Sequence, residues 1–147
     1  MNLKFNIDVD FNKGQTIQLA KEVLFRCMVK MHQLAVNNAP VDTGRLKGSL
    51  NIYPSISGFS EYLLSDGVDY GIHVEYGTSP HYVSPDNLKR WSELKLGDPN
   101  LAYAVAQKIL KFGTEAQPFM RPALMQVQNI WVERIWNDVW KKQSIKQ

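Results

Sequence analysis

The chain has 147 residues, of which 44% are hydrophobic and 21% are charged. This length and composition predict one globular domain over residues 1–147, and they exclude bulk disorder, collagen and a simple coiled coil. The net charge is only +3, which is well below the charge of a dedicated nucleic-acid binder.

The single cysteine, Cys27, excludes an internal disulfide and a multi-cysteine zinc site. It lies among apolar residues of a helical pattern, which favours a small buried thiol over a nucleophile. No apolar run approaches the ~18 residues of a membrane span, and the N-terminus lacks the apolar segment of a secretory signal. We therefore expect a protein made in a reducing cytoplasm, with no membrane partner.

The first half of the chain predicts a strand, a long helix and a hairpin. Residues 1–10 alternate between apolar and polar types, which is typical of a half-buried strand. Over residues 15–38 apolar residues recur every three or four positions, which predicts a long amphipathic helix that Pro40 ends. Residues 48–66 predict a hairpin, with Gly58 at the reversal and Pro54 in an edge strand.

Two connecting segments are less regular. Residues 41–47 predict a turn in which Asp42 or Thr43 caps backbone N–H groups and Gly44 takes a positive φ. Residues 68–78 alternate like a strand, but Tyr70 with Val74 and Ile72 with Tyr76 also have helical spacing, so both structures stay open.

The second half predicts helices. A helical insertion over residues 85–112 has two start signals, Ser84-Pro85 and Asp98-Pro99, and a C-terminal helix covers residues 121–142. An apolar stripe follows that last helix at Leu124, Val127, Trp131, Ile135 and Val139. The fold class is therefore α+β, a small antiparallel sheet packed against the long N-terminal amphipathic helix, with additional helices in the C-terminal half.

Residue patterns for catalysis are weak. His73 and His81 flank Glu75, which permits a hydrolase site, but a capping or interface carboxylate is favoured because Glu75 lies in an aromatic-rich segment. The histidines lack metal-ligand spacing, and no nucleophile-elbow, phosphate-loop or dinucleotide-binding motif occurs. We expect no catalytic residue, no metal and no cofactor.

Two surfaces are candidates for protein contacts. Trp131, Trp136 and Trp140 give the last helix a broad aromatic face, which suits either an interface or completion of the core. Charge is also divided along the chain, with +3 in residues 1–50, −5 in residues 51–88 and +5 in residues 89–147. Glu61 and Asp69 in the acidic segment are therefore candidates for contact with a basic surface of a neighbour.

Three segments, taken together, resemble the minor tail-component family of tailed double-stranded DNA phages, the tail-completion or head–tail joining proteins. They are residues 39–50 (APVDTGRLKGSL), residues 69–78 (DYGIHVEYGT) and residues 117–123 (QPFMRPA). Eleven positions match the family's motifs: Pro40, Asp42, Thr43, Gly44, Tyr70, Glu75, Gly77, Thr78, Pro118, Phe119 and Pro122. Gly71 departs from the family, in which a small helix-favouring alanine is usual.

The resemblance implies a non-enzymatic virion structural protein at the neck, the head-proximal end of the tail. It implies a ring of copies, a hexamer in the virion, that contacts head–tail connector and tail-tube proteins while DNA passes through the lumen unread. Two alternatives stay open. One is a tail terminator that caps the tail tube, and the other is a small DNA-binding protein that uses its basic termini, including Lys141 and Lys142.

Overall fold

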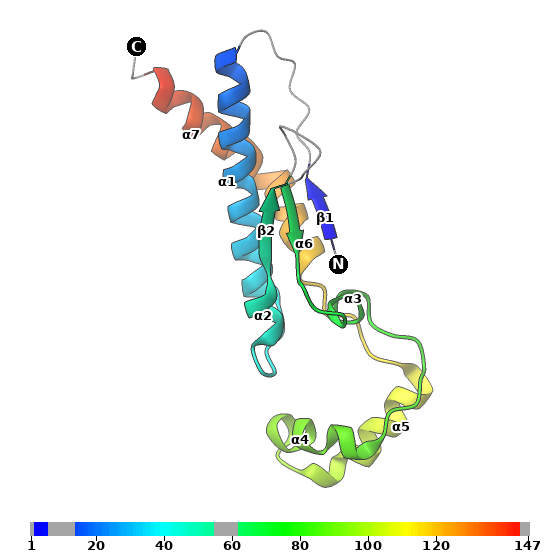
Figure 1. Ribbon diagram of the computed structural model, residues 1–147. Helices are drawn as coiled ribbons and strands as arrows, with labels where there is room; N and C mark the ends of the chain where they lie inside the picture. Colours follow the sequence, from blue (N-terminus) through cyan, green and yellow to red (C-terminus); the bar gives the residue numbers. More distant parts are fainter. Residues whose placement is uncertain (1, 6–13, 55–61, 145–147) are drawn as a thin grey trace. The chain divides into compact units, whose positions relative to one another are not determined.

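A computed structural model describes residues 2–5, 14–54 and 62–144 (Figure 1). The chain forms two compact units, which we call the sheet unit (residues 1–71 and 118–147) and the insert unit (residues 72–117). The sequence predicted one domain over residues 1–147, whereas the structure has two compact units. The helical insertion predicted over residues 85–112 lies inside the insert unit.

The sheet unit contains a three-stranded antiparallel sheet in the order β1-β3-β2. β1 (Asn2–Phe5) and β2 (Asn51–Pro54) both pair with β3 (Tyr62–Ser65), and Leu64 at the centre is fully buried. The predicted hairpin is confirmed, and Pro54 ends an edge strand as expected. The predicted strand over 1–10 is confirmed for Asn2–Phe5, whereas its remainder and the reversal at Gly58 lie outside the described residues.

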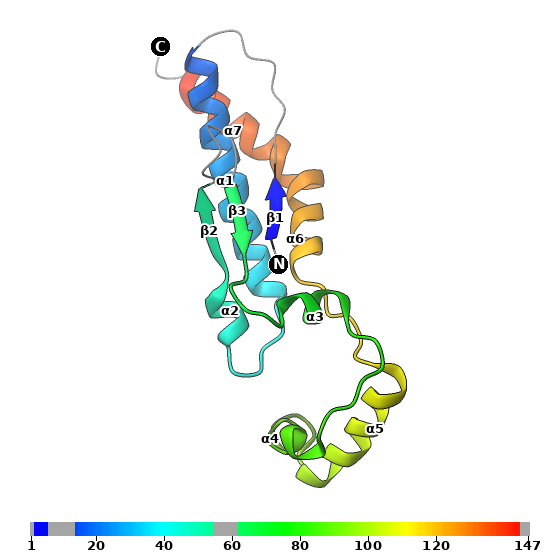
Figure 2. The ribbon, with the colours of Figure 1, turned by 45° about the vertical axis from the view of Figure 1, so that its right-hand side comes forward.

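The long helix α1 (Gly14–Asn38) confirms the prediction for residues 15–38. It contacts β2 and β3, and also the C-terminal helices α6 (Met120–Gln126) and α7 (Val132–Ser144) (Figures 1 and 2). The side chains buried along α1 recur at helical spacing: Val23, Leu24, Cys27, Met28, Met31 and Ala35. The antiparallel sheet and the long helix confirm the α+β class.

One local prediction in the sheet unit was wrong, and another is confirmed. The predicted turn over residues 41–47 continues into a short helix, α2 (Arg45–Ser49), in which the N–H of Gly48 donates to the carbonyl oxygen of Gly44 at 3.0 Å. The helix predicted for residues 121–142 is confirmed as a continuous helical run from Met120 to Ser144, in which a π-helical turn, η2 (Val127–Trp131), lies between α6 and α7.

The predicted apolar stripe of the C-terminal helix is covered both before and after the π-helical turn. The hydrogen bonds of that turn reach one residue further than those of an α-helix, so the turn departs locally from a constant ~100° per residue. Val127 and Val139 are buried, and the other three residues of the stripe, Leu124, Trp131 and Ile135, are half-buried.

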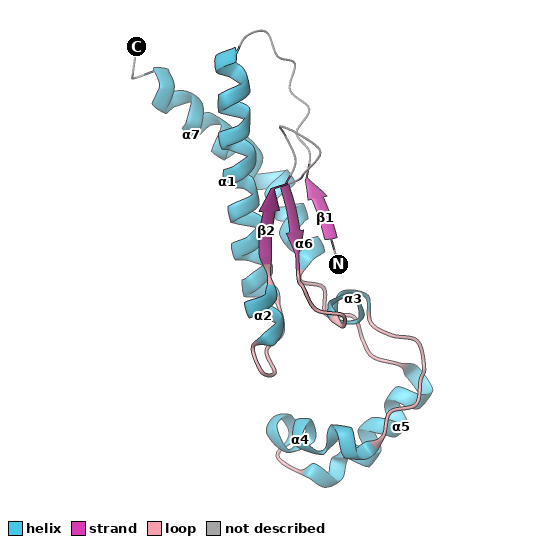
Figure 3. Ribbon diagram, in the orientation of Figure 1, coloured by secondary structure: helices cyan, strands magenta, loops and turns pink. Residues whose placement is uncertain are grey.

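The insert unit consists of helices and loops (Figure 3). α3 (Gly71–Tyr76) leads into it, and α4 (Pro85–Leu96), the 3₁₀-helix η1 (Pro99–Leu101) and α5 (Ala102–Phe112) follow. The predicted insertion over 85–112 is confirmed, including its second start, where the Asp98 carboxylate accepts the N–H of Asn100 at 2.8 Å. The segment 68–78, which periodicity left open, is helical over Gly71–Tyr76.

Candidate assembly surface

The first family segment lies in the loop between α1 and α2. Thr43 accepts the N–H of Arg45 through its hydroxyl oxygen at 3.4 Å, and Gly44 has the predicted positive φ of 80°. Asp42 is exposed, and Pro40 lies two residues after the last residue of α1. These residues shape the connection from the long helix to the sheet, which is a structural role.

The third family segment connects the insert unit to α6. Phe119 is fully buried, and its carbonyl oxygen accepts the side-chain amide of Asn38 at 3.5 Å. This contact joins the last residue of α1 to the start of α6. Pro122 is half-buried in the first turn of α6, and Pro118 is exposed. The segment therefore fixes where the chain returns to the core of the sheet unit.

The second family segment contains α3 and the residues after it. Tyr70 is exposed, whereas Glu75 is fully buried on α3, so Glu75 is a structural carboxylate rather than an exposed interface group. The carbonyl oxygen of Val74 on the same helix accepts the N–H of Gln117 at 2.8 Å. The segment thus links the start of the insert unit, at α3, to its last residue, Gln117.

Gly77 and Thr78 extend that connection into a two-residue antiparallel bridge, which we call the clasp (Thr78 and Thr114). Each threonine donates its N–H to the carbonyl oxygen of the other, at 3.1 and 3.2 Å, and the two hydroxyl oxygens are 2.9 Å apart. A Cβ at Gly77 would lie 2.4 Å from the Thr114 carbonyl oxygen, and one at Gly113 would lie 1.8 Å from that of Thr78. Only glycine leaves room for the clasp at these two positions.

A second close approach occurs at Gly71, the first residue of α3. Asp66 is only 1% exposed, and a Cβ at Gly71 would lie 1.7 Å from its Oδ2 atom. The carboxylate therefore occupies the space that the methyl group of an alanine would need. This steric conflict, and not helix propensity, accounts for the glycine at the start of α3.

The insert unit buries small side chains and exposes large ones. Every residue from 72 to 117 is described, and the buried ones among them are Glu75, Ser92, Ala102, Ala106 and Gly113. On α4 and η1 the exposed large apolar residues are Trp91, Leu94, Leu96 and Leu101, and on α5 they are Tyr103, Leu110 and Phe112. We call these seven residues the insert surface.

The sequence analysis did not identify the insert surface. The signal that could have found it is the excess of apolar residues over residues 101–112 (LAYAVAQKILKF), which is more than one side of a helix can hold. A helix that is apolar around most of its circumference is covered on more than one side in the functional protein.

The three predicted interface tryptophans have different surroundings. Trp131 is half-buried, and the ammonium group of Lys30 on α1 lies 4.0 Å from its ring centroid, which is a cation–π contact inside the sheet unit. Trp136 and Trp140 are stacked, with ring centroids 6.4 Å apart, and Trp140 is 53% exposed. Trp140 therefore stays a candidate for an external contact, whereas Trp131 contributes to internal packing.

The acidic segment is less acidic on the surface than in the sequence. Asp66 and Glu75 are buried, and Asp86 forms an ion pair with Lys89 at 2.7 Å. The hydrogen bond from Lys89 also holds the pKa of Asp86 below its ordinary value. Asp69 is exposed, and Glu61 lies outside the described residues. Burial and pairing thus reduce the negative field that a basic neighbour would meet.

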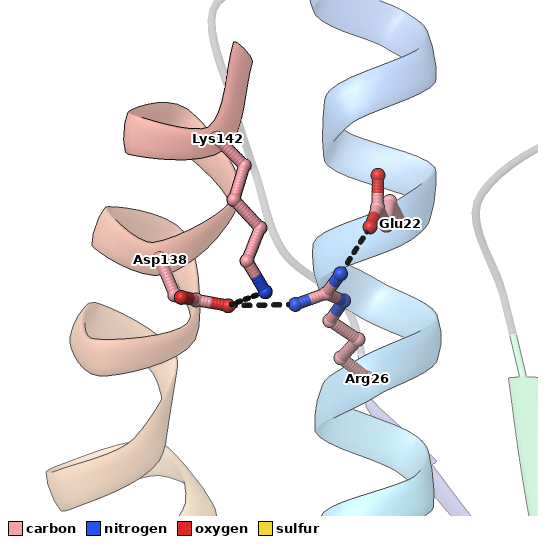
Figure 4. Close-up of polar contacts among 4 residues, drawn as sticks. All are labelled: Glu22, Arg26, Asp138 and Lys142. Carbon is pink, nitrogen blue, oxygen red and sulfur yellow. Dashed lines mark hydrogen bonds and ion pairs between the residues drawn. The ribbon is translucent and has the colours of Figure 1, made fainter. Parts of the chain in front are cut away.

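Basic side chains near the C-terminus are also partly neutralised. Asp138 on α7 accepts hydrogen bonds from Lys142 at 3.1 Å and from Arg26 of α1 at 2.8 Å, and Arg26 also contacts Glu22 (Figure 4). The hydrogen bond from Lys142, followed by the effects of Arg26, lowers the pKa of the Asp138 carboxyl. The cluster is on the surface, so its effect on stability is small.

Cys27 lies on α1, and His81 lies in the loop before α4. Cys27 is buried, and this burial raises the pKa of its thiol to about 11. The Nδ1 atom of His81 lies 2.9 Å from the carbonyl oxygen of Ser79, which can only accept, and 3.3 Å from the hydroxyl oxygen of Thr78, beside the clasp. Within the described residues no group of three or more histidine, cysteine, aspartate or glutamate side chains could hold a metal ion, and no helix is long and apolar enough to cross a membrane.

Comparisons with known proteins were made by family model, by sequence and by structure. No family model, no curated protein and no solved structure matches this chain.

Proposed function

We propose that this protein is a non-enzymatic structural subunit of a tailed double-stranded DNA phage or prophage, which completes the tail and joins it to the head. In this proposal copies assemble into a ring at the neck and contact the connector and tail-tube proteins on either side. The resemblance of three segments to the minor tail-component family supports the location. The structure places these segments at the α1–α2 connection, at the clasp and at the start of α6.

The single observation that supports assembly is the insert surface. None of the large apolar side chains of residues 72–117 is fully buried, and Phe112, Tyr103 and Leu94 are more than half exposed. A unit of 46 residues can bury only a small core of its own. Exposed apolar surfaces of this kind mark sites of contact with another protein. A protein that works by surface complementarity needs such contacts, whereas a small DNA-binding protein needs unpaired basic groups.

The experiment combines a solution mass with a location. Mass photometry or sedimentation of the purified protein should give a species larger than the 16.8 kDa monomer. Immunogold electron microscopy of virions from the phage or prophage that encodes the chain should label the head–tail junction. Labelling of the tail tip or the capsid, or absence of the protein from purified virions, would contradict the proposal. Tight binding to DNA with a steep salt dependence would instead favour the DNA-binding alternative.

A further inference from the structure

The exposed area of the insert surface limits the size of each contact. At about 150–250 Å² for a large apolar side chain, the seven residues leave roughly 700 Å² exposed at their exposed fractions of 37–73%. A standard interface takes about 800 Å² from each partner. A subunit that makes two contacts divides its area between them, so each contact takes roughly half of 700 Å² or less from each copy, which is a small interface.

The apolar side chains of α5 lie on two opposite sides of the helix. Leu110 follows Tyr103 by about two helical turns, so these two residues share one side. Phe112 follows Tyr103 by about two and a half turns and lies on the other side. Leu101 is the last residue of η1, directly before α5, and lies about three turns before Phe112. Ala102 and Ala106 are buried, and the pair α4 and α5 is in contact. A single partner on one side would leave the other apolar side in water.

The charges of the insert unit favour another copy over a strongly charged partner. Residues 72–117 contain five acidic and five basic side chains, so the unit has no net charge. Lys89 is paired with Asp86 at 2.7 Å, and Lys108 with Glu115 at 3.1 Å. Two copies of the unit therefore do not repel each other, and neither nucleic acid nor an acidic protein is attracted by a net field.

We propose that the insert unit is the contact between successive copies of this chain. The side of α5 that carries Tyr103 and Leu110 in one copy packs against the side that carries Leu101 and Phe112 in the next. A contact between two different sides of the same element is head-to-tail, and such contacts close into rings when the rotation between copies permits. The inference deepens the proposed function, because it assigns the subunit contact of the ring to a particular surface.

The test uses the full-length chain in two variants, each of which removes one side. Variant X carries Tyr103→Asn and Leu110→Asn, and variant Y carries Phe112→Asn. All three positions are exposed, so circular dichroism and the melting temperature should match those of the wild type. The control is Met125→Asn, an equally exposed apolar position on α6, which should assemble like the wild type.

Head-to-tail contact gives a specific pattern of masses. The wild type should associate beyond a dimer, whereas variants X and Y should each stay close to 16.8 kDa, with association weakened about tenfold or more. A mixture of X and Y should form a one-to-one pair, because X keeps the side that Y lacks. If Phe112→Asn fails to fold, Leu101→Gln tests the same side.

Three results would overturn the inference. The first is a wild type that stays monomeric at high concentration. If the melting temperature of variant Y is then also lower than that of the wild type, the insert surface is covered within its own chain. The second is unchanged association of X and Y. The third is that one variant alone dimerises, which indicates a two-fold contact of one side with itself. Gold labelling at the head–tail junction together with the second or the third result would leave the proposed function standing while the insert contact fails. A monomeric wild type would contradict both the insert contact and the larger species that the proposed function expects.

Discussion

Gly71→Ala should destabilise the protein because of the buried Asp66 carboxylate. An added Cβ would lie 1.7 Å from the Oδ2 atom, whereas ordinary contact begins at 3.4 Å, so the two groups must separate by about 1.7 Å (3.4 minus 1.7). Asp66 is 1% exposed and has little room to move. Forcing extra atoms into such a site costs about 1–3 kcal/mol of the free energy of unfolding, which lowers the melting temperature by roughly 2–4 °C per kcal/mol in a chain of this size.

The assay is urea unfolding followed by far-ultraviolet circular dichroism, in a double-mutant cycle with Asp66→Ala. With the carboxylate removed, the cost of Gly71→Ala should fall by about 1 kcal/mol or more. The matched control is Gly48→Ala in α2, where nothing lies within 4 Å of an added Cβ, and alanine should raise stability by about 0.5–1 kcal/mol. An equal cost of Gly71→Ala with and without the Asp66 carboxylate would refute the steric explanation.

Three further predictions concern the clasp, the contact of α4 with α5, and the buried thiol. Gly113→Ala should destabilise the protein by about 1–2 kcal/mol more than Gly97→Ala and should speed amide exchange at Thr114. Both glycines have a positive φ, but only at Gly113 does a backbone oxygen occupy the place of the added Cβ. Equal effects of the two substitutions in hydrogen exchange and urea unfolding would contradict this. Ser92→Ala should raise the free energy of unfolding by about 1 kcal/mol, because the buried hydroxyl has no hydrogen-bond partner among the described residues; a loss of stability in the same assay would show a partner for it. Cys27 should react with a thiol reagent at pH 8 about 100-fold more slowly than an exposed cysteine. Its pKa is raised from 9.0 to about 11, and the fraction of reactive thiolate falls accordingly. If the folded protein reacts as fast as the protein unfolded in urea, the thiol is accessible and the prediction is wrong.

The raised pKa of Cys27 also fixes the sign of its effect on stability. The folded state disfavours the thiolate relative to the unfolded state, so the contribution of Cys27 is fully present below pH 9 and is lost as the pH rises through about 11. Cys27→Ser or Cys27→Ala should remove this alkaline loss.

Local sequence patterns determined most of the elements. Helical periodicity over residues 15–38, together with Pro40, placed α1 within one residue of its ends, because a regular repeat and a terminating proline act within the segment itself. The start signals near residues 84 and 98 likewise placed α4 and η1. Asp98 caps η1 as predicted, whereas Ser84 makes no side-chain capping hydrogen bond, so Pro85 in the first turn is the signal that placed α4.

Tertiary structure alone decided which of the motif residues face one another. Gly77 and Gly113 are far apart in the sequence, and their need for glycine comes from the carbonyl groups across the clasp. Asp66 similarly explains Gly71, although no periodicity connects the two. The π-helical turn within the C-terminal helix was also not predicted, because the extra residue in its hydrogen-bonded ring cannot be read from apolar spacing.

The division of charge along the chain likewise did not predict the charge on the surface. A sequence count gives −5 to residues 51–88, but it cannot register that Asp66 and Glu75 are buried or that Asp86 is paired with Lys89. Apolar side chains are also counted equally wherever they lie. The sequence determined how many large apolar residues the insert unit has. Only folding decided that small residues are buried there while Tyr103, Leu110 and Phe112 stay exposed. The physical reason is that the distance between two packed helices depends on the side chains at their contact, and small side chains allow a close approach.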